Sequence, residues 1–213
     1  MTIIGAGTVT TAHTLSVTLY HILSNPSVKS KLQEALREIH SQSDKVTWNA
    51  LSQLPYLSAV ITEGLRLSFG VSHRLQRVSP DVALPYKQYT IPPGTPVSQT
   101  QMFIMTDPIL FPRPKEFIPE RWILDALPKG FPTPQEAKKF FVPFSRGTRS
   151  CVGMNLAYAE LFMTVGTLLR PVDAGGSVEM KLFQTTERDF DVEYDWFNPC
   201  PPLDSKGLRV EIC

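Results

Sequence analysis

A cysteine at position 151 lies between two glycines, Gly147 and Gly153, and directly before an apolar run with helical spacing. Glycine permits backbone bends and close approaches that a Cβ would resist. The first N–H groups of a helix have no partner inside the helix and carry partial positive charge, which stabilises a thiolate placed there. The expected helix face consists of Leu156, Ala159, Phe162, Met163 and Gly166. A lone cysteine is usually an inert buried thiol, so its neighbours must decide between that reading and a metal ligand.

The residues around Cys151 form the pattern F-x-x-G-x-R-x-C-x-G, whose fixed positions are Phe144, Gly147, Arg149, Cys151 and Gly153. This pattern resembles the haem-ligand loop of the cytochrome P-450 (haem-thiolate monooxygenase) family. The resemblance implies that Cys151 is the axial thiolate on the iron of haem (iron-protoporphyrin IX), a ligand that favours O–O cleavage. It further implies that Arg149 reaches a haem propionate and that Phe144 packs beside the sulfur.

Two further segments carry the same resemblance. Glu63 and Arg66 are spaced i, i+3 in a predicted helix at 56–69 and therefore share one face. An exposed pair of this kind is worth under about 1 kcal/mol. The family instead joins its E-x-x-R pair to an arginine in a P-E-R-(F/W) element, which residues 119–122 supply with Arg121. The resemblance implies one buried, charge-assisted structural network that fixes the segment carrying the cysteine.

Near the N-terminus, residues 6–11 read A-G-T-V-T-T within a predicted helix at 3–23. Taken alone, they predict an ordinary core helix whose threonines bond back to carbonyl groups. Placed before the cysteine loop, they resemble the family's oxygen-activation motif A-G-x-(D/E)-T-T. The resemblance implies that Gly7 makes room for O2 and that Thr10 holds a proton-delivering water. Val9 stands where the family has an acid.

The turn after the E-x-x-R helix, residues 69–74, lines the substrate pocket in the family. Arg74 is the candidate for a second propionate contact, whereas His73 is read as a packed or exposed histidine and not as a catalytic one. Residues 197–199 are expected in a turn that also lines this pocket. Basic residues near the cysteine loop form either a solvated surface or, by resemblance, part of a docking face for an electron donor: Lys129, Lys138, Lys139 and Arg146.

The elements that must position these residues give a mainly α chain with small β-sheets (α+β), the cytochrome P-450 fold in the resembled family. Helices are predicted at 3–23, 27–40, 56–69 and 154–169, with a short helix capped by Thr47 that ends near residue 54. Strands are predicted within 71–84, at 181–186 and 208–212, and as two strands within 89–105 joined by the turn 92–95. Loops are expected at 41–45 and 170–177. The proline-rich but aromatic-rich stretch 80–143 is expected to be irregular and packed.

Composition limits the alternatives. The 213 residues are 42% hydrophobic with a formal net charge of +1, which indicates a globular chain and no nucleic-acid partner. Three scattered cysteines, Cys151, Cys200 and Cys213, argue against a disulfide framework. No apolar run reaches about 18 residues, and the N-terminus lacks the features of a signal peptide. Because members of the family are longer, we expect residues 1–213 to be the C-terminal haem-binding part of a single cytochrome P-450 domain, with the N-terminal half and any membrane anchor missing.

The resemblance implies a monooxygenase that inserts one atom of O2 into a small hydrophobic organic substrate. Electrons would come from NADPH through NADPH-cytochrome P-450 reductase, at the cytosolic face of the endoplasmic reticulum membrane. The cysteine segment is similar to those of fungal microsomal members that modify secondary metabolites such as terpenoids or polyketides.

Two other functions stay open. One is a haem-thiolate isomerase or dehydratase that rearranges an already oxidised substrate without O2, which Val9 in the acid position favours. The other is an inactive, truncated product that cannot hold haem, which a start inside the motif helix favours. Turnover without NADPH would separate the first alternative from a monooxygenase.

Overall fold

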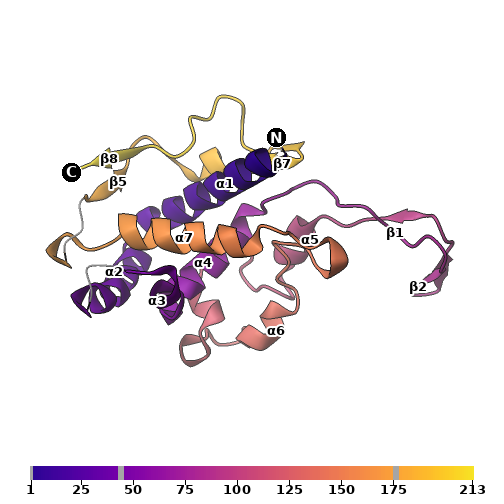
Figure 1. Cartoon of the computed structure of the whole chain (residues 1–213), viewed down its shortest axis with the longest axis horizontal. Coiled ribbons are helices and arrows are strands. Elements are labelled where there is room, and N and C mark those ends of the chain that lie inside the picture. Colours follow the sequence, from indigo (N-terminus) through magenta and orange to yellow (C-terminus); the bar gives the residue numbers. More distant parts are fainter. Residues whose placement is uncertain (1, 43–45, 175–177) are drawn as a thin grey trace.

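Four long helices make up the body of the computed structural model, which describes residues 2–42, 46–174 and 178–213. They are α1 (Thr2–Ser24), α2 (Pro26–Gln42), α4 (Pro55–Ser68) and α7 (Met154–Leu168). Helix α1 packs on α4 and α7, and α2 packs on α4 (Figure 1). Their contact surfaces form one apolar core that includes Ile22, Leu32, Leu36, Leu57, Ile61, Leu161 and Val165.

Local chemistry explains where these helices begin and end. Helix α4 begins with Pro55, a residue suited to a first helical position because its missing N–H would have no partner there. It ends at Phe69, which adopts a left-handed conformation with φ of 56°. The short helix α3 (Trp48–Ser52) is capped by the Thr47 side chain, which accepts from the backbone N–H of Ala50. The same kind of cap, from Thr100 to Met102, starts α5 (Gln101–Met105).

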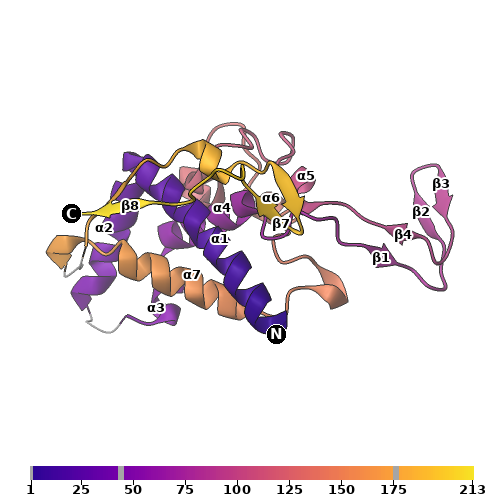
Figure 2. The same cartoon turned by 90° about the horizontal axis from the view of Figure 1, so that it is seen from above.

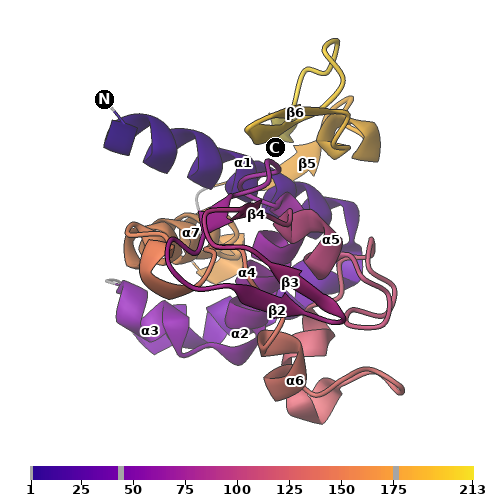
Figure 3. The same ribbon diagram turned by 90° about the vertical axis from the view of Figure 1, so that its right-hand side faces the viewer.

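In the described parts of the chain, eight short strands form four antiparallel pairs. These are β1 (Arg77–Val78) with β4 (Pro96–Val97), β2 (Leu84–Tyr86) with β3 (Tyr89–Ile91), β5 (Met180–Leu182) with β8 (Val210–Ile212), and β6 (Tyr194–Trp196) with β7 (Asn198–Cys200). The arm that carries β1 to β4 extends away from the helical body in Figure 2. Figure 3 looks along this arm, with β2 and β3 toward the viewer.

The stretch between α5 and α7 is irregular and packed, as expected for 80–143, but residues 80–97 of that range are mostly exposed and lie in the arm that carries β2 to β4. It contains η1 (Pro119–Trp122), η2 (Leu124–Ala126), α6 (Pro134–Lys138) and η3 (Gly147–Arg149), and two further 3-10 turns follow α7, η4 (Val172–Ala174) and η5 (Glu187–Phe190). Pro119, Arg121, Pro134 and Ala137 are buried within this stretch. In the part of the chain that the structure describes, no helix is long and apolar enough to cross a membrane.

The expected fold class, mainly α with small sheets, is confirmed, but several details were wrong. Within 89–105, the two expected strands β3 and β4 do flank the turn 92–95, but β3 pairs with β2 and β4 with β1, and residues 101–105 are helical. Because Thr100 offers a cap, the apolar run after it forms a helix and not a strand. Residues 197–199 belong to the hairpin β6–β7, with Phe197 at its tip. The predicted loops at 41–45 and 170–177 lie partly outside the described residues.

The buried face of α7 matches the prediction only in part, since Phe162 and Gly166 are buried as expected. Leu156 and Met163 are 61% and 37% exposed, whereas Leu161, Phe162, Val165 and Gly166 are buried. Gly166 lies against Leu51 of α3 at a separation that leaves no room for a Cβ. Because α7 has apolar residues on both sides, the sequence pattern did not show which side is buried.

Candidate functional site

The loop before α7 holds Cys151 through its backbone. The Cys151 N–H donates to the carbonyl of Phe144 at 2.9 Å, and the Ser150 N–H donates to Gly147 at 3.0 Å. Gly147 sits at φ of +76°, a left-handed conformation that glycine adopts without strain. Gly153 then precedes α7 as its N-cap, without a side-chain hydrogen bond to the first turn. The thiol of Cys151 is therefore exposed at the start of a helix, on a fixed backbone.

Aromatic rings pack this loop against α7 and η1. The Phe144 ring packs against Tyr158 of α7 with centroids 5.2 Å apart. Burial raises the pKa of Tyr158 to about 12, so its hydroxyl is neutral at physiological pH. Phe141 packs edge-on against Trp122 of η1, also at 5.2 Å. The loop is thus anchored on α7 and on η1.

Exposed apolar side chains are found on the cysteine loop and on the N-terminal part of α1. Val152 is fully exposed, and on α1 both Ile4 and Val9 are more than half exposed. The N-terminal end of α1 and the loop before α7 lie on the same side of the molecule in Figures 1 and 2. A haem requires an accessible thiolate, a flat apolar surface and no Cβ close to the sulfur. Gly153 meets the last condition because it has no Cβ, whereas a Cβ at that position would contact Cys151 Sγ at 4.0 Å. The residues present fit a haem.

Residues 6–9 of the expected oxygen motif are exposed on α1, whereas Thr10 is half-buried and Thr11 is buried. Nothing lies within 4 Å of the position that a Cβ on Gly7 would take, so this stretch of helix is open. The Thr10 hydroxyl donates to the carbonyl of Ala6 at 2.7 Å, within its own helix. This is the back-bonding that an ordinary helical threonine makes.

Arg74 and Arg149, the two residues expected at propionates, are both exposed. Arg74 lies between α4 and β1, and Arg149 ends η3. In residues 2–42, 46–174 and 178–213, neither guanidinium has a hydrogen bond or an ion pair. A guanidinium without a partner can form a bidentate pair with a carboxylate.

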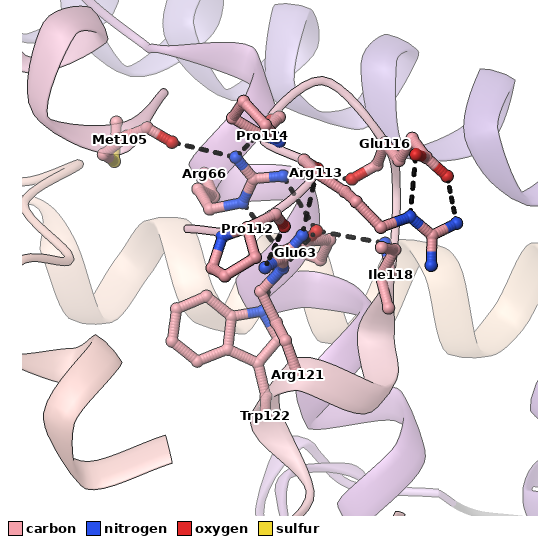
Figure 4. A network of polar contacts seen from close by, with 10 residues as sticks. All are labelled: Glu63, Arg66, Met105, Pro112, Arg113, Pro114, Glu116, Ile118, Arg121 and Trp122. Atoms are coloured by element: carbon pink, nitrogen blue, oxygen red, sulfur yellow. Dashed lines mark hydrogen bonds and ion pairs between the residues drawn. The ribbon is translucent and has the colours of Figure 1, made fainter. Parts of the chain in front are cut away.

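Glu63, Arg66 and Arg121 lie together in the core (Figure 4). Arg66 forms a two-pronged contact with the Glu63 carboxylate, with both N–O distances at 2.9 Å. Arg121 Nε donates to Glu63 Oε1 at 2.9 Å. The side chains of Glu63 and Arg66 are 0% exposed and that of Arg121 is 2% exposed. The pair is therefore not an exposed bridge, and its charges are stabilised by one another, by backbone groups and by neighbouring aromatic side chains.

The two arginines also bind carbonyl groups of the irregular stretch. Arg66 donates to Met105 at 2.8 Å and to Pro114 at 2.6 Å, and Arg121 donates to Pro112 at 3.1 Å. Burial alone would raise the pKa of Glu63, but the charges and hydrogen bonds of both arginines outweigh it and hold that pKa below its ordinary value. The network therefore remains ionised and ties helix α4 to the backbone of 105–121.

Sequence reasoning missed three contacts around the site. Trp122 Nε1 donates to Glu63 Oε2 at 2.8 Å. Arg77 Nη2 of β1 donates to the Ser145 hydroxyl in the cysteine loop at 3.0 Å. Trp122 was visible as the last residue of P-E-R-W, but nothing in the spacing of these residues indicates such partners.

The third missed contact joins the two turns expected at the substrate pocket. Asp195 accepts from the Ser72 hydroxyl and contacts His73 Nδ1, both at 2.8 Å. The backbone N–H of Ser72 donates to the carbonyl of Phe197 at 3.1 Å. Hydrogen bonds from Ser72 and His73 hold the pKa of Asp195 below its ordinary value. The tip of the hairpin β6–β7 is thereby fixed to the turn after α4.

A cavity of about 440 Å³ lies elsewhere, where α2, the end of α7 and β5 meet. Its charged lining is already paired: Arg37 binds Asp173 at 3.1 Å and Lys29 lies 3.7 Å from Glu179. Cys151 is at the opposite end of α7. The cavity therefore has no part in the site at the cysteine.

Comparison with known proteins agrees with the fold and the loop. Residues 1–174 match the family model described as cytochrome P-450. The chain is 47% identical over 210 residues to cytochrome P-450 monooxygenase oblB of Aspergillus clavatus, covering 98% of this chain and 38% of that protein. It is 42% identical to N-acetyltryptophan 6-hydroxylase ivoC of Emericella nidulans, covering 99% and 40%. It is also 42% identical to fusicoccadiene C-8 hydroxylase of Alternaria brassicicola, covering 99% and 38%.

The chain belongs to the cytochrome P-450 family, whose cofactor is a haem with a thiolate ligand. It spans about two fifths of the length of the curated relatives that it matches.

Proposed function

We propose that this chain is the haem-binding part of a monooxygenase with Cys151 as the axial ligand. The observation that supports this most is the exposed Cys151 thiol, held by the bond of its own N–H to the Phe144 carbonyl at 2.9 Å. Bound haem supplies the oxygen chemistry, while the protein positions the substrate and handles protons. Arg149 and Arg74 bind the propionates, Phe144 packs beside the sulfur, and the glycines at 147 and 153 give the loop its close approach.

When haem is bound, Gly7 on α1 would leave space for O2 and Thr10 Oγ1 would hold the proton-delivering water. The Thr10 hydroxyl donates to the Ala6 carbonyl at 2.7 Å and can accept a hydrogen bond from this water through its lone pairs. The substrate is a small hydrophobic secondary metabolite, which the names of relatives acting on fusicoccadiene and N-acetyltryptophan support. The turn 69–74 and the tip of the hairpin β6–β7 line its pocket.

Electrons come from NADPH through a cytochrome P-450 reductase at the endoplasmic reticulum membrane. Lys129, Lys138, Lys139 and Arg146 lie on the surface near the cysteine loop and are the candidates for its docking face. The side chains of Lys129, Lys138 and Lys139 are exposed, whereas the Arg146 guanidinium donates to the Lys138 carbonyl at 2.6 Å. A positive surface of this kind speeds association with an acidic partner and is screened by salt.

A haem-thiolate isomerase or dehydratase is the second candidate. The observation favouring it is on α1, where exposed Val9 replaces the usual acid and the neighbouring Thr10 hydroxyl is bonded to its own helix. The two functions are separated by turnover of candidate substrates under labelled O2 with NADPH and reductase. A monooxygenase incorporates one labelled oxygen atom into the product and stops without NADPH. Turnover without NADPH and without label would contradict the monooxygenase.

A further inference from the structure

Trp122 touches both the buried carboxylate network and the segment that leads to Cys151. Its indole Nε1 donates to Glu63 Oε2 at 2.8 Å. Its ring meets Phe141 edge-on, with centroids 5.2 Å apart and planes at 62°. One side chain thus has a polar end in the network and an apolar face on the cysteine loop segment, and Figure 4 shows it beside Arg121.

The indole N–H supplies a hydrogen-bond donor to the buried Glu63 carboxylate. Oε1 accepts from Arg66 Nη2, from Arg121 Nε and from the Ile118 N–H. Oε2 accepts from Arg66 Nε and from Trp122. Without the indole, Oε2 would keep a single donor although the carboxylate is fully buried. A buried acceptor that loses its partner cannot recover it from water, so the N–H has a defined role.

The Trp122 ring links the Glu63 network to the segment that holds the thiol. Phe141 lies three positions before Phe144, whose carbonyl accepts the Cys151 N–H at 2.9 Å. The Phe144 ring in turn packs on Tyr158 of α7. A shift of Phe141 therefore moves the backbone that carries the Cys151 hydrogen bond. The path from Glu63 through Trp122 and Phe141 consists of direct contacts and one short stretch of chain.

Other aromatic rings cover the charges of the network. Phe111 lies 5.5 Å from the guanidinium of Arg66, and Phe131 lies 5.0 Å from that of Arg121. Trp122 packs on Phe111 as well, with centroids 6.2 Å apart. Trp122 therefore contacts three neighbouring parts of the core. These are the Glu63 network, the ring of Phe111 and Phe141 in the segment before the cysteine loop.

We propose that Trp122 is a positioning residue that holds the Cys151 loop in register with the Glu63 network. Its indole N–H fixes the ring, and the ring fixes Phe141. The proposal rests on the proposed role of Cys151 as the haem ligand. A misplaced loop leaves the thiolate displaced from the iron, so that the ligand protonates or dissociates more readily.

The test compares Trp122→Phe and Trp122→Leu with the control Trp48→Phe in the haem-loaded protein made from its complete reading frame. Trp48 begins α3 and is 41% exposed, so its replacement serves as a control for the loss of a tryptophan away from the network. The readout is the Soret band of the reduced CO complex, which separates thiolate-ligated from thiol-ligated haem. Trp122→Phe should raise the proportion of the thiol-ligated form roughly tenfold at equal haem content, as expected for one lost hydrogen bond to a buried charge. Trp122→Leu should raise it further.

Phe141→Leu provides a second measurement, since it leaves the indole bond to Glu63 intact and removes only the ring contact. It should raise the thiol-ligated proportion as well, and it decides the question if Trp122→Leu does not fold. Wild-type ratios in both Trp122→Phe and Phe141→Leu would overturn the proposal. Absence of the thiolate band in the wild type would overturn the role of Cys151 instead. In that case, hydrogen exchange of the indole N–H in haem-free protein decides: slower exchange at Trp122 than at Trp48 supports the contact with Glu63, and equal rates overturn it.

Discussion

Arg121 Nε donates to Glu63 Oε1 at 2.9 Å across a separation of 58 residues. This bond joins helix α4 to the turn η1, and Arg66 holds the same carboxylate from within α4. The charges are out of water, so their attraction must compensate for lost hydration. A network of this kind fixes geometry more than it adds net stability, which suits a segment that must present one thiolate.

Glu63→Gln removes the negative charge but keeps the shape of the side chain. Arg66 and Arg121 then remain charged and buried without a counter-charge, which should cost about 3–5 kcal/mol of unfolding free energy. Thermal unfolding and haem content measure the effect, and both should fall together. Glu116→Gln is the control, because this carboxylate is exposed and pairs with exposed Arg113, acting on Arg121 only through its charge, and its loss should leave the melting temperature nearly unchanged. Normal haem content and melting temperature in Glu63→Gln would show that the network is dispensable.

Gly64 lets α1 and α4 come together. A Cβ at position 64 would lie 2.0 Å from Thr18 Oγ1 and 3.0 Å from Thr18 Cβ. Gly64→Ala should therefore destabilise the protein by about 1–3 kcal/mol, the usual cost of overpacking. Thr18→Ala removes the nearest atom and should restore part of the loss in the double variant. Gly5→Ala meets nothing within 4 Å and should be neutral or slightly stabilising. Equal effects of the two alanines in chemical denaturation would contradict this packing.

His21 makes stability depend on pH. Burial lowers its pKa to about 4, and its ring stacks on Phe117 with centroids 4.8 Å apart. Nearby Glu63 opposes this shift and Arg66 adds to it. The unfolded chain, with a His pKa of about 6.5, binds more protons between about pH 6.5 and 4, so stability falls as pH drops through this window, by up to about 3 kcal/mol.

His21→Phe keeps a ring on Phe117 and removes the titration. Urea unfolding at several pH values should show a shallower loss of stability between pH 6.5 and 4 than in the wild type, with other groups supplying the remainder. Tyr20→Phe is the control, because this neighbouring tyrosine packs against the His21 ring but does not titrate in that window. Identical pH profiles for His21→Phe and the wild type would mean that the buried imidazole does not contribute.

The sequence was most informative where the spacing of residues is compatible with only one local structure. The i, i+3 relation of Glu63 and Arg66 required a shared helix face, and glycines beside Cys151 required an unusual loop. It was least informative where partners come from distant segments. No local pattern indicates that Trp122 donates to Glu63 or that Asp195 binds Ser72 across 123 residues.

Short elements were also difficult to predict, for a physical reason. Residues 101–105 contain methionine, phenylalanine and isoleucine, which suit a strand or a buried helix equally. The Thr100 cap decided for a helix. On α7, apolar residues surround the helix, so periodicity alone did not show which side faces Leu51 and which side is exposed.

The most direct test of the account is the CO spectrum of the reduced, haem-loaded protein in two cysteine variants. Cys151 is the exposed thiol before α7, whereas Cys200 lies half-buried in β7 with its Sγ 3.4 Å from the Pro201 carbonyl. Cys200→Ser should keep the Soret band that thiolate ligation gives, and Cys151→Ser should lose it. Retention of that band in Cys151→Ser, or its loss in both variants, would contradict the assignment of Cys151 as the iron ligand.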